Sequence, residues 1–209
     1  MFKNRIEAGK LLASKLIKFR RNKNVVVVAL PRGGVPIGFL IAKEIKAPLY
    51  ISLVKKIGHP FNKEYAIGSA NLRNSFIRTD VTGISEAYIK KEIQNIRAFL
   101  SKKYKWYEEQ LNIQNFENKI VILVDDGVAT GSTLLSSIEL IREQKPLKII
   151  VVLPVAPFSS LKKIEKYKIV EEVICLSTPL NFRSISQFYD DFDEVEDSEV
   201  INYLKLANE

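Results

Sequence analysis

The sequence predicts an α/β fold with a doubly wound, mainly parallel sheet. Two observations lead to this prediction. Short β-branched apolar runs without a polar alternate face are typical of strands buried on both sides of a parallel sheet. Helical patterns separate these runs along the chain. The expected strands are VVVVAL (25–30), LYISLV (49–54), KIVILV (119–124), KIIVVLPV (148–155) and KIVEEVICL (168–176).

The clearest helical pattern covers residues 86–111. Its apolar side chains recur every three or four residues, which places them on one stripe of a long helix, with Ser85 as the expected N-cap. The stripe consists of Ile89, Ile93, Ile96, Leu100, Tyr104, Tyr107 and Leu111. The basic, amphipathic residues 1–19 are expected to form a further helix that covers the sheet.

Composition limits the class of protein. A chain of 209 residues, 46% of them hydrophobic, suits a single domain over residues 1–209. One cysteine and one histidine exclude a disulfide framework and a cysteine-based zinc site. The apolar runs are much shorter than the roughly 20 residues that span a bilayer, so no membrane partner is expected, and the expected location is cytoplasmic.

The net charge of +8 is unevenly distributed. Residues 1–24 carry eight Lys or Arg against one acid, and residues 185–209 carry eight acids against one lysine. The excess positive charge therefore belongs to residues 25–184. Such a region suits either a nucleic acid or a highly phosphorylated small molecule. Without a recognisable nucleic-acid motif, the small molecule is favoured.

Two of the expected strands end in unusual loops, LPRGGVPIG (30–38) and VDDGVATGST (124–133). In open parallel sheets, ligands bind beyond the carboxyl ends of the strands, so both loops can face one ligand. The small residues after 128, which lead into a helix, predict an anion cradle. Beside it, Asp125 and Asp126 could bind the vicinal hydroxyls of a ribose, directly or through a divalent ion.

Four apolar residues, two acids and then x-x-x-T-G-x-T closely resemble the phosphoribosyl-pyrophosphate (PRPP) signature of type I phosphoribosyltransferases. The segments AGKLLASKL, ALPRGGVPIG, KKIGHPFNKEYAIGSA, PVAP and FYDDF extend the resemblance, to bacterial phosphoribosyltransferase-domain proteins, over nearly the whole chain. The resemblance implies that Asp125 and Asp126 hold the ribose hydroxyls and, with Arg32, form the catalytic set. It implies that the 5-phosphate is bound by Ala129, Thr130, Gly131, Ser132 and Thr133.

The same resemblance places the pyrophosphate at Arg32, Gly33 and Gly34. We add Lys55 and Lys56, which follow the second expected strand, as further pyrophosphate ligands. Residues 177–209 are the candidate hood and C-terminal segment, with Phe182 and Tyr189 as acceptor contacts. The glycine- and lysine-containing segment 55–72 is the candidate mobile cover, and its His59 is left outside the catalytic set.

The implied reaction is transfer of phosphoribose from PRPP to a nitrogen acceptor, with nucleobases among the candidates, and release of pyrophosphate. Mg²⁺ is the expected cofactor, bound mainly through PRPP, with Asp125 and Asp126 as additional candidate ligands. Ala129 stands where enzymes of 6-oxopurines usually carry an acid, which disfavours hypoxanthine and guanine. The sequence does not name the acceptor.

Two other interpretations differ in class. A PRPP- or nucleotide-binding regulator without transfer activity is the alternative function. A dinucleotide-binding oxidoreductase is excluded, because RGGVPIG does not match G-x-G-x-x-G. The expected partners are PRPP and a small acceptor, with a homodimer as a candidate assembly and nucleic acid disfavoured.

Overall fold

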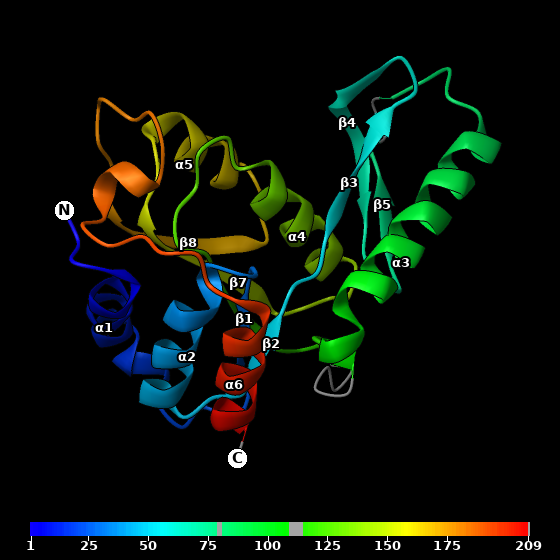
Figure 1. Ribbon diagram of the computed structural model, residues 1–209. Helices are drawn as coiled ribbons and strands as arrows, with labels where there is room; N and C mark the ends of the chain where they lie inside the picture. Colours follow the sequence, from blue (N-terminus) through cyan, green and yellow to red (C-terminus); the bar gives the residue numbers. More distant parts are fainter. Residues whose placement is uncertain (79–80, 109–114, 209) are drawn as a thin grey trace.

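Strands and helices alternate around a parallel sheet whose strand order is β2-β1-β6-β7-β8 (Figure 1). The computed structural model describes residues 1–78, 81–108 and 115–208, without the side chains of residues 64 and 103–108. The strands of this sheet are β1 (Val25–Ala29), β2 (Leu49–Ile51), β6 (Ile120–Val124), β7 (Lys148–Val155) and β8 (Val170–Ser177). All five expected strands are therefore present, and together with the helices they confirm the predicted fold class.

Helices cover both faces of the sheet, which explains the continuous apolar strands. In β1, Val25 and Val27 belong to one core cluster, and Val26 and Val28 belong to the other. The first cluster is completed by α1 (Arg5–Lys15), α2 (Gly34–Ile45) and α6 (Asp197–Asn208), and the second by α4 (Ser132–Arg142) and α5 (Phe158–Ile164). A polar side chain on either face of β1 would be buried without water to hydrogen-bond it. A short 3₁₀ helix, Ile17–Phe19, joins α1 to β1.

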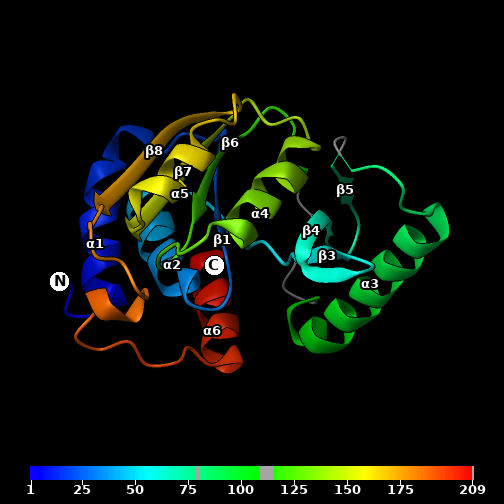
Figure 2. The same cartoon turned by 90° about the horizontal axis from the view of Figure 1, so that it is seen from above.

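A second, antiparallel sheet projects from the core. It contains β3 (Lys55–His59), β4 (Asn62–Ala70) and β5 (Ser75–Ile77), and α3 (Glu86–Glu108) packs on it. We call residues 55–108 the arm. In Figures 1 and 2 the arm lies on the side of α4 away from α1 and α2. The candidate cover, 55–72, is therefore mostly a β-hairpin, and β2 ends at Ile51 rather than leading directly into the two lysines.

The long helix follows its predicted stripe as far as the structure describes it. The Ser85 hydroxyl accepts a hydrogen bond from the Tyr88 N–H (3.3 Å), as an N-cap does. Ile96 and Leu100 are buried against Ile57 and Ile67. The side chains of residues 104 and 107, and the whole of residue 111, lie outside the described part of the chain.

The C-terminal region divides into two parts. Residues 178–196, which include the 3₁₀ helix Ser186–Phe188, cross the carboxyl edge of the sheet and pair with the N-terminus, where the Phe2 N–H bonds the carbonyl of Phe188 (2.8 Å). By contrast, α6 packs on α2 and β2, and Asn208 bonds both backbone groups of Leu49. Thus α6 belongs to the helix layer, whereas residues 178–196 lie at the carboxyl edge of the sheet. No helix among the described residues is long and apolar enough to cross a membrane.

Candidate active site

Two loops at the carboxyl edge of the sheet pack directly on each other. They follow β1 and β6, which are neighbours in the sheet and run parallel. A Cβ atom built on Gly34 would lie 2.8 Å from the carbonyl oxygen of Val124, and one built on Gly33 would overlap the carboxylate of Asp126. Glycine therefore permits this approach, and two motifs that are far apart in the sequence form one site.

The Asp pair holds two like charges in a poorly hydrated place. Oδ1 of Asp125 accepts a hydrogen bond from the backbone N–H of Asp126 (2.9 Å). Withdrawal of the carboxyl from water, followed by the negative charge of Asp126, raises the pKa of Asp125 well above its ordinary value. Burial also raises the pKa of Asp126, whose residue is only 8% exposed.

Arg5 opposes the negative charge of Asp126 and was missed by the sequence analysis. Its Nε and Nη2 atoms both lie 2.8 Å from Oδ2 of Asp126. The charge of Arg5 and its hydrogen bond lower the pKa of Asp126 against the effect of burial. A signal existed in the sequence: a cation in the first turn of a helix faces the positive end of the helix dipole, so it needs a partner elsewhere.

Tyr189 supports the loop that carries Asp126. Its hydroxyl donates a 2.7 Å hydrogen bond to the backbone carbonyl of Asp126, and its ring packs between Phe2 and Phe192. Burial raises the pKa of Tyr189, so its hydroxyl remains a donor. With 6% of its surface exposed, Tyr189 does not offer a face to an acceptor in this structure. Phe182, the other expected acceptor contact, stacks on Phe188 with ring centroids 5.4 Å apart.

The small-residue loop after Val128 has the form of an anion cradle. Gly131 has a φ of 82° and directly precedes α4, so the first N–H groups of the helix have no partners within it. The hydroxyls of Thr130 and Ser132 lie 3.3 Å apart, and Thr130 is exposed. Ser160 anchors the loop by donating to the carbonyl of Ala129 (2.5 Å).

Arg32 lies beside an acidic segment rather than in open solvent. The peptide bond between Pro31 and Arg32 is cis. The guanidinium forms an ion pair with Glu194 and lies 4.0 Å from a carboxylate oxygen of Glu196 and of Asp197. The C-terminal acids therefore cover the cation that the resemblance assigns to pyrophosphate.

Lys55 and Lys56 occupy the start of β3, on opposite faces of the arm sheet. The Nζ atom of Lys55 lies 3.8 Å from the centroid of the Phe99 ring on α3. Lys56 pairs with Ser69, which pairs with Phe76, so these three share the other face. Arg142 of α4 lies over Phe76, which shows that this second face is turned to the core.

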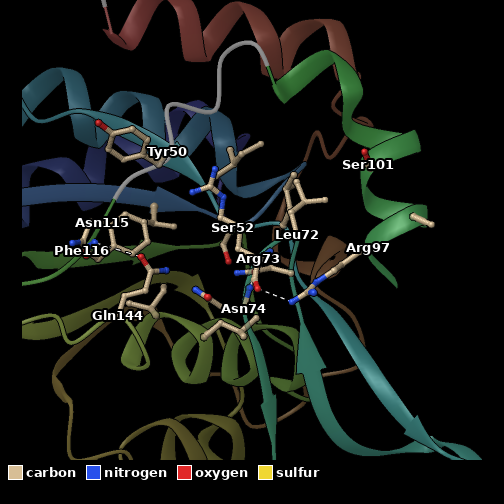
Figure 3. A pocket seen from close by; sticks show the side chains of 17 residues that line it. Tyr50, Ser52, Leu72, Arg73, Asn74, Arg97, Ser101, Asn115, Phe116 and Gln144 are labelled. Carbon is tan, nitrogen blue, oxygen red and sulfur yellow. Dashed lines mark hydrogen bonds between the residues drawn. The ribbon is translucent and has the colours of Figure 1, made fainter. Parts of the chain in front are cut away.

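A cavity of about 880 Å³ is lined by residues of the core and of the arm (Figure 3). Tyr50 and Phe116 line it from the core, and residues 71–74 and Arg97 line it from the arm. The Arg97 guanidinium donates to the carbonyl of Arg73 (2.6 Å) and ties the β4–β5 turn to α3. Within the described chain none of the predicted site residues lines this cavity, so it belongs to the junction between core and arm.

Among the described residues, no group of three or more His, Cys, Asp or Glu side chains could hold a metal ion. The carboxylates of the site are the Asp pair, and one of them is already bound by Arg5. These donors do not form a protein-only magnesium site. They do fit an ion that arrives on the phosphates of its ligand, with Asp125 as a neighbouring oxygen donor.

A parallel sheet covered by helices, with the two loops and the paired carboxylates at its carboxyl edge, defines an α/β protein of the class that binds ligands beyond the carboxyl ends of its strands. The family model of the phosphoribosyl transferase domain matches residues 3–193, and the chain belongs to this family.

The name of a curated relative agrees with this assignment, and solved structures share the fold. "Putative phosphoribosyl transferase Rv0571c" of Mycobacterium tuberculosis is 31% identical over all of this chain, which spans about half (47%) of that protein. TT1426 from Thermus thermophilus has a TM-score of 0.90 and 30% identity, with 100% of this chain and 99% of that chain covered. AQ2163 from Aquifex aeolicus, at 19% identity, a TM-score of 0.51 and coverage of 85% and 75%, shares the fold.

Proposed function

We propose that the protein transfers phosphoribose from PRPP to a nitrogen acceptor and releases pyrophosphate. The observation that carries the proposal is the direct packing of the Gly33-Gly34 loop on the Asp125-Asp126 loop. One ligand about the size of a sugar phosphate can then contact both loops. Its ribose hydroxyls would bind the Asp pair, its 5-phosphate the cradle at 129–133, and its pyrophosphate Arg32 with the backbone of Gly33 and Gly34.

The geometry suits stabilisation of a charged transition state. When the bond from ribose C1 to pyrophosphate breaks, C1 develops oxocarbenium character and negative charge grows on the leaving group. Arg32 would stabilise the leaving group electrostatically. The helices α2 and α4 begin at the two loops, and each presents the positive end of its dipole to phosphate. Mg²⁺ bound to PRPP would neutralise further charge on the pyrophosphate.

Water must be excluded, because it would hydrolyse PRPP. The β3–β4 hairpin of the arm and residues 178–196 are the segments that we propose as cover and hood. Phe61, near the tip of the hairpin, is 94% exposed and would be shielded by closure. We further propose that Tyr189 holds the Asp126 loop and leaves the acceptor to other residues of the hood, including Phe182.

The first test is a thermal shift with PRPP and Mg²⁺. A ligand that binds only the native state stabilises it by about 2.7 kcal/mol at roughly 100 times its Kd. We expect the shift to vanish in the double variant Asp125→Asn with Asp126→Asn. No shift in the unmodified protein at millimolar PRPP would contradict PRPP binding.

The second test identifies the acceptor. Purines, pyrimidines and other nitrogen compounds are incubated with PRPP and Mg²⁺, and pyrophosphate release is measured. Release with one class of acceptor supports the transferase and names its substrate. PRPP binding without release across the panel would favour the alternative, a PRPP- or nucleotide-binding regulator.

A further inference from the structure

The guanidinium of Arg5 joins three parts of the chain. Arg5 opens α1, and two of its nitrogens reach Oδ2 of Asp126 at 2.8 Å, with both side chains only 12% exposed. Its Nη1 donates to the carbonyl of Asp193 (2.7 Å), and its Cζ lies 3.8 Å from the centroid of the Phe192 ring. Polar contacts along the edge of the guanidinium and the Phe192 ring on its face therefore hold Arg5 in a single orientation.

The stability of α1 does not explain an arginine here. Asn4 already caps the helix by accepting from the N–H of Glu7 (3.1 Å), and Glu7 places an acid in the first turn. A cation in that turn opposes the helix dipole. The contacts that fix Arg5 all lead to the candidate site or to the segment beside it.

The carboxylate of Asp126 is held between Arg5 and Gly33. Among the described residues, the charged and titratable groups around this carboxylate are Asp125 on the same loop and Arg5 on α1, with Tyr189 bound to the carbonyl of Asp126. Gly33 packs against the carboxylate and brings no charge. Within the described chain Arg5 is therefore the cation in direct contact, and without it the carboxylate would lose the two nitrogens that orient it.

We propose that Arg5 is a positioning residue, which holds the carboxylate of Asp126 in a fixed orientation against Gly33 so that it can accept a hydrogen bond from a ribose hydroxyl. This inference rests on the proposed function. Arg5 acts through Asp126 and not by contact with the ligand. A displaced carboxylate would lose its charge-assisted hydrogen bond to the ribose.

The binding experiment uses ribose 5-phosphate and pyrophosphate as separate probes. Affinities are measured by calorimetry at one fixed pH and ionic strength. In Arg5→Gln the carboxylate of Asp126 loses its paired nitrogens, so ribose 5-phosphate should bind less tightly than to the unmodified protein. We expect a loss of about tenfold or more, equal to roughly 1.4 kcal/mol or more.

Two comparisons separate this role from a general loss of charge. Lys10→Gln removes one exposed cation from the same helix and should leave the affinity for ribose 5-phosphate unchanged. Arg5→Lys keeps the charge but not the paired geometry, so it should restore only part of that affinity. Pyrophosphate lacks the ribose, and its affinity should change much less than that of ribose 5-phosphate.

A second arm of the experiment combines Arg5→Gln with Asp126→Asn. If Arg5 acts through the carboxylate of Asp126, Arg5→Gln should weaken ribose 5-phosphate binding in the unmodified protein and have little further effect once residue 126 is asparagine.

The outcomes are distinguishable. If the unmodified protein binds neither PRPP nor ribose 5-phosphate, the proposed function fails, and with it the part of this inference that concerns ribose. If it binds them and Arg5→Gln shows the same affinity for ribose 5-phosphate, Arg5 has no positioning role. An affinity loss in Arg5→Gln that is equal for ribose 5-phosphate and pyrophosphate, or that persists in full beside Asp126→Asn, would refute the claim that Arg5 acts through Asp126.

Discussion

The phenol of Tyr189 donates a hydrogen bond of 2.7 Å to the backbone carbonyl of Asp126, although 63 residues separate the two in the chain. This bond connects the C-terminal segment to the centre of the candidate site. The carbonyl is buried, so water would not replace the hydroxyl as its hydrogen-bond partner. The bond therefore stabilises the loop more than an exposed hydrogen bond would.

Tyr189→Phe should therefore weaken both the fold and the site. Removal of the hydroxyl leaves the carbonyl of Asp126 unsatisfied, at a cost of about 1–3 kcal/mol in the free energy of unfolding. We also expect ribose 5-phosphate to bind less tightly, because the carboxylate of the same residue loses its fixed position. Calorimetry and denaturant unfolding measure the two effects. Tyr203→Phe, on α6, makes the same chemical change away from the loop and should leave the affinity unaltered.

Most of the core and the two loop motifs of the candidate site could be predicted from the sequence. Strand runs such as VVVVA are readable because a strand buried on both faces has apolar residues at every position, and the loop motifs are contiguous. The place of Arg5 in a first helical turn indicated that it needs a partner, but the sequence could not identify Asp126 as that partner, since the pairing depends on how α1 packs on the sheet.

The sequence did not predict the sheet of the arm, for a different reason. Its strands are half exposed and mix lysine, glycine and polar residues, so neither apolar periodicity applies. Gly58 belongs to the segment 55–72, which the sequence predicts to be a mobile cover. In the structure it lies within β3, where a Cβ atom would come 2.5 Å from the carbonyl oxygen of Lys63, so it serves close strand approach.

Gly131→Val should reduce binding of ribose 5-phosphate and of PRPP. Gly131 has a φ of 82°, which a β-branched residue adopts only with strain, and its backbone is expected to approach the 5-phosphate. Gly83→Val provides a matched control, because Gly83 has a φ of 76°, open space around it and a place in the arm. Both variants should lose a similar amount of stability, and equal ligand affinities in the two would move the phosphate elsewhere.

Asp125→Asn should stabilise the protein without ligand while it abolishes ribose binding. Because the pKa of Asp125 is raised in the folded state, the folded protein binds this proton more tightly than the unfolded chain. Stability is therefore lost as the pH rises from about 4, the unfolded pKa, through the higher folded pKa. Asparagine carries no charge and avoids this loss.

We expect the Tm of Asp125→Asn to exceed that of the unmodified protein at neutral pH by about 2–4 °C for each kcal/mol regained. The difference should disappear as the pH approaches about 4. Scanning calorimetry across this range measures it, with the exposed Asp190→Asn as the control. A Tm advantage that increased toward acid would have the wrong sign and would contradict the raised pKa.

The acids beside Arg32 should compete with pyrophosphate. Glu194 and Glu196 are about two-thirds exposed, and such pairs contribute little stability, so an incoming ligand can displace them. Glu194→Gln with Glu196→Gln should increase the affinity for pyrophosphate several-fold, and the increase should diminish at high salt.

Asp190→Asn with Asp191→Asn changes the net charge equally, and no contact with Arg32 is described for either residue. This control pair should increase the affinity much less. If both pairs increased it to the same extent, the effect would be one of overall charge, and a specific competition for Arg32 would be excluded.

Lys55 and Lys56 should have different roles, because they lie on opposite faces of the arm sheet. Lys55 is directed to the Phe99 ring of α3, and a cation held over an aromatic face contributes to docking of that helix. Lys56 shares the face that turns to the core, from which its flexible side chain can extend to an anion when the arm closes.

We expect Lys56→Ala to lower the affinity for pyrophosphate and PRPP with little effect on ribose 5-phosphate. We expect Lys55→Ala to lower the Tm slightly and to leave the affinities for all three ligands unchanged. The two variants remove the same charge one residue apart, so each is the control for the other. Calorimetry with the three ligands decides the assignment. If Lys55→Ala weakens pyrophosphate binding, the cation of Lys55 must leave Phe99 when the arm closes. If neither variant weakens pyrophosphate binding, the pyrophosphate is bound by the Arg32 loop without the arm.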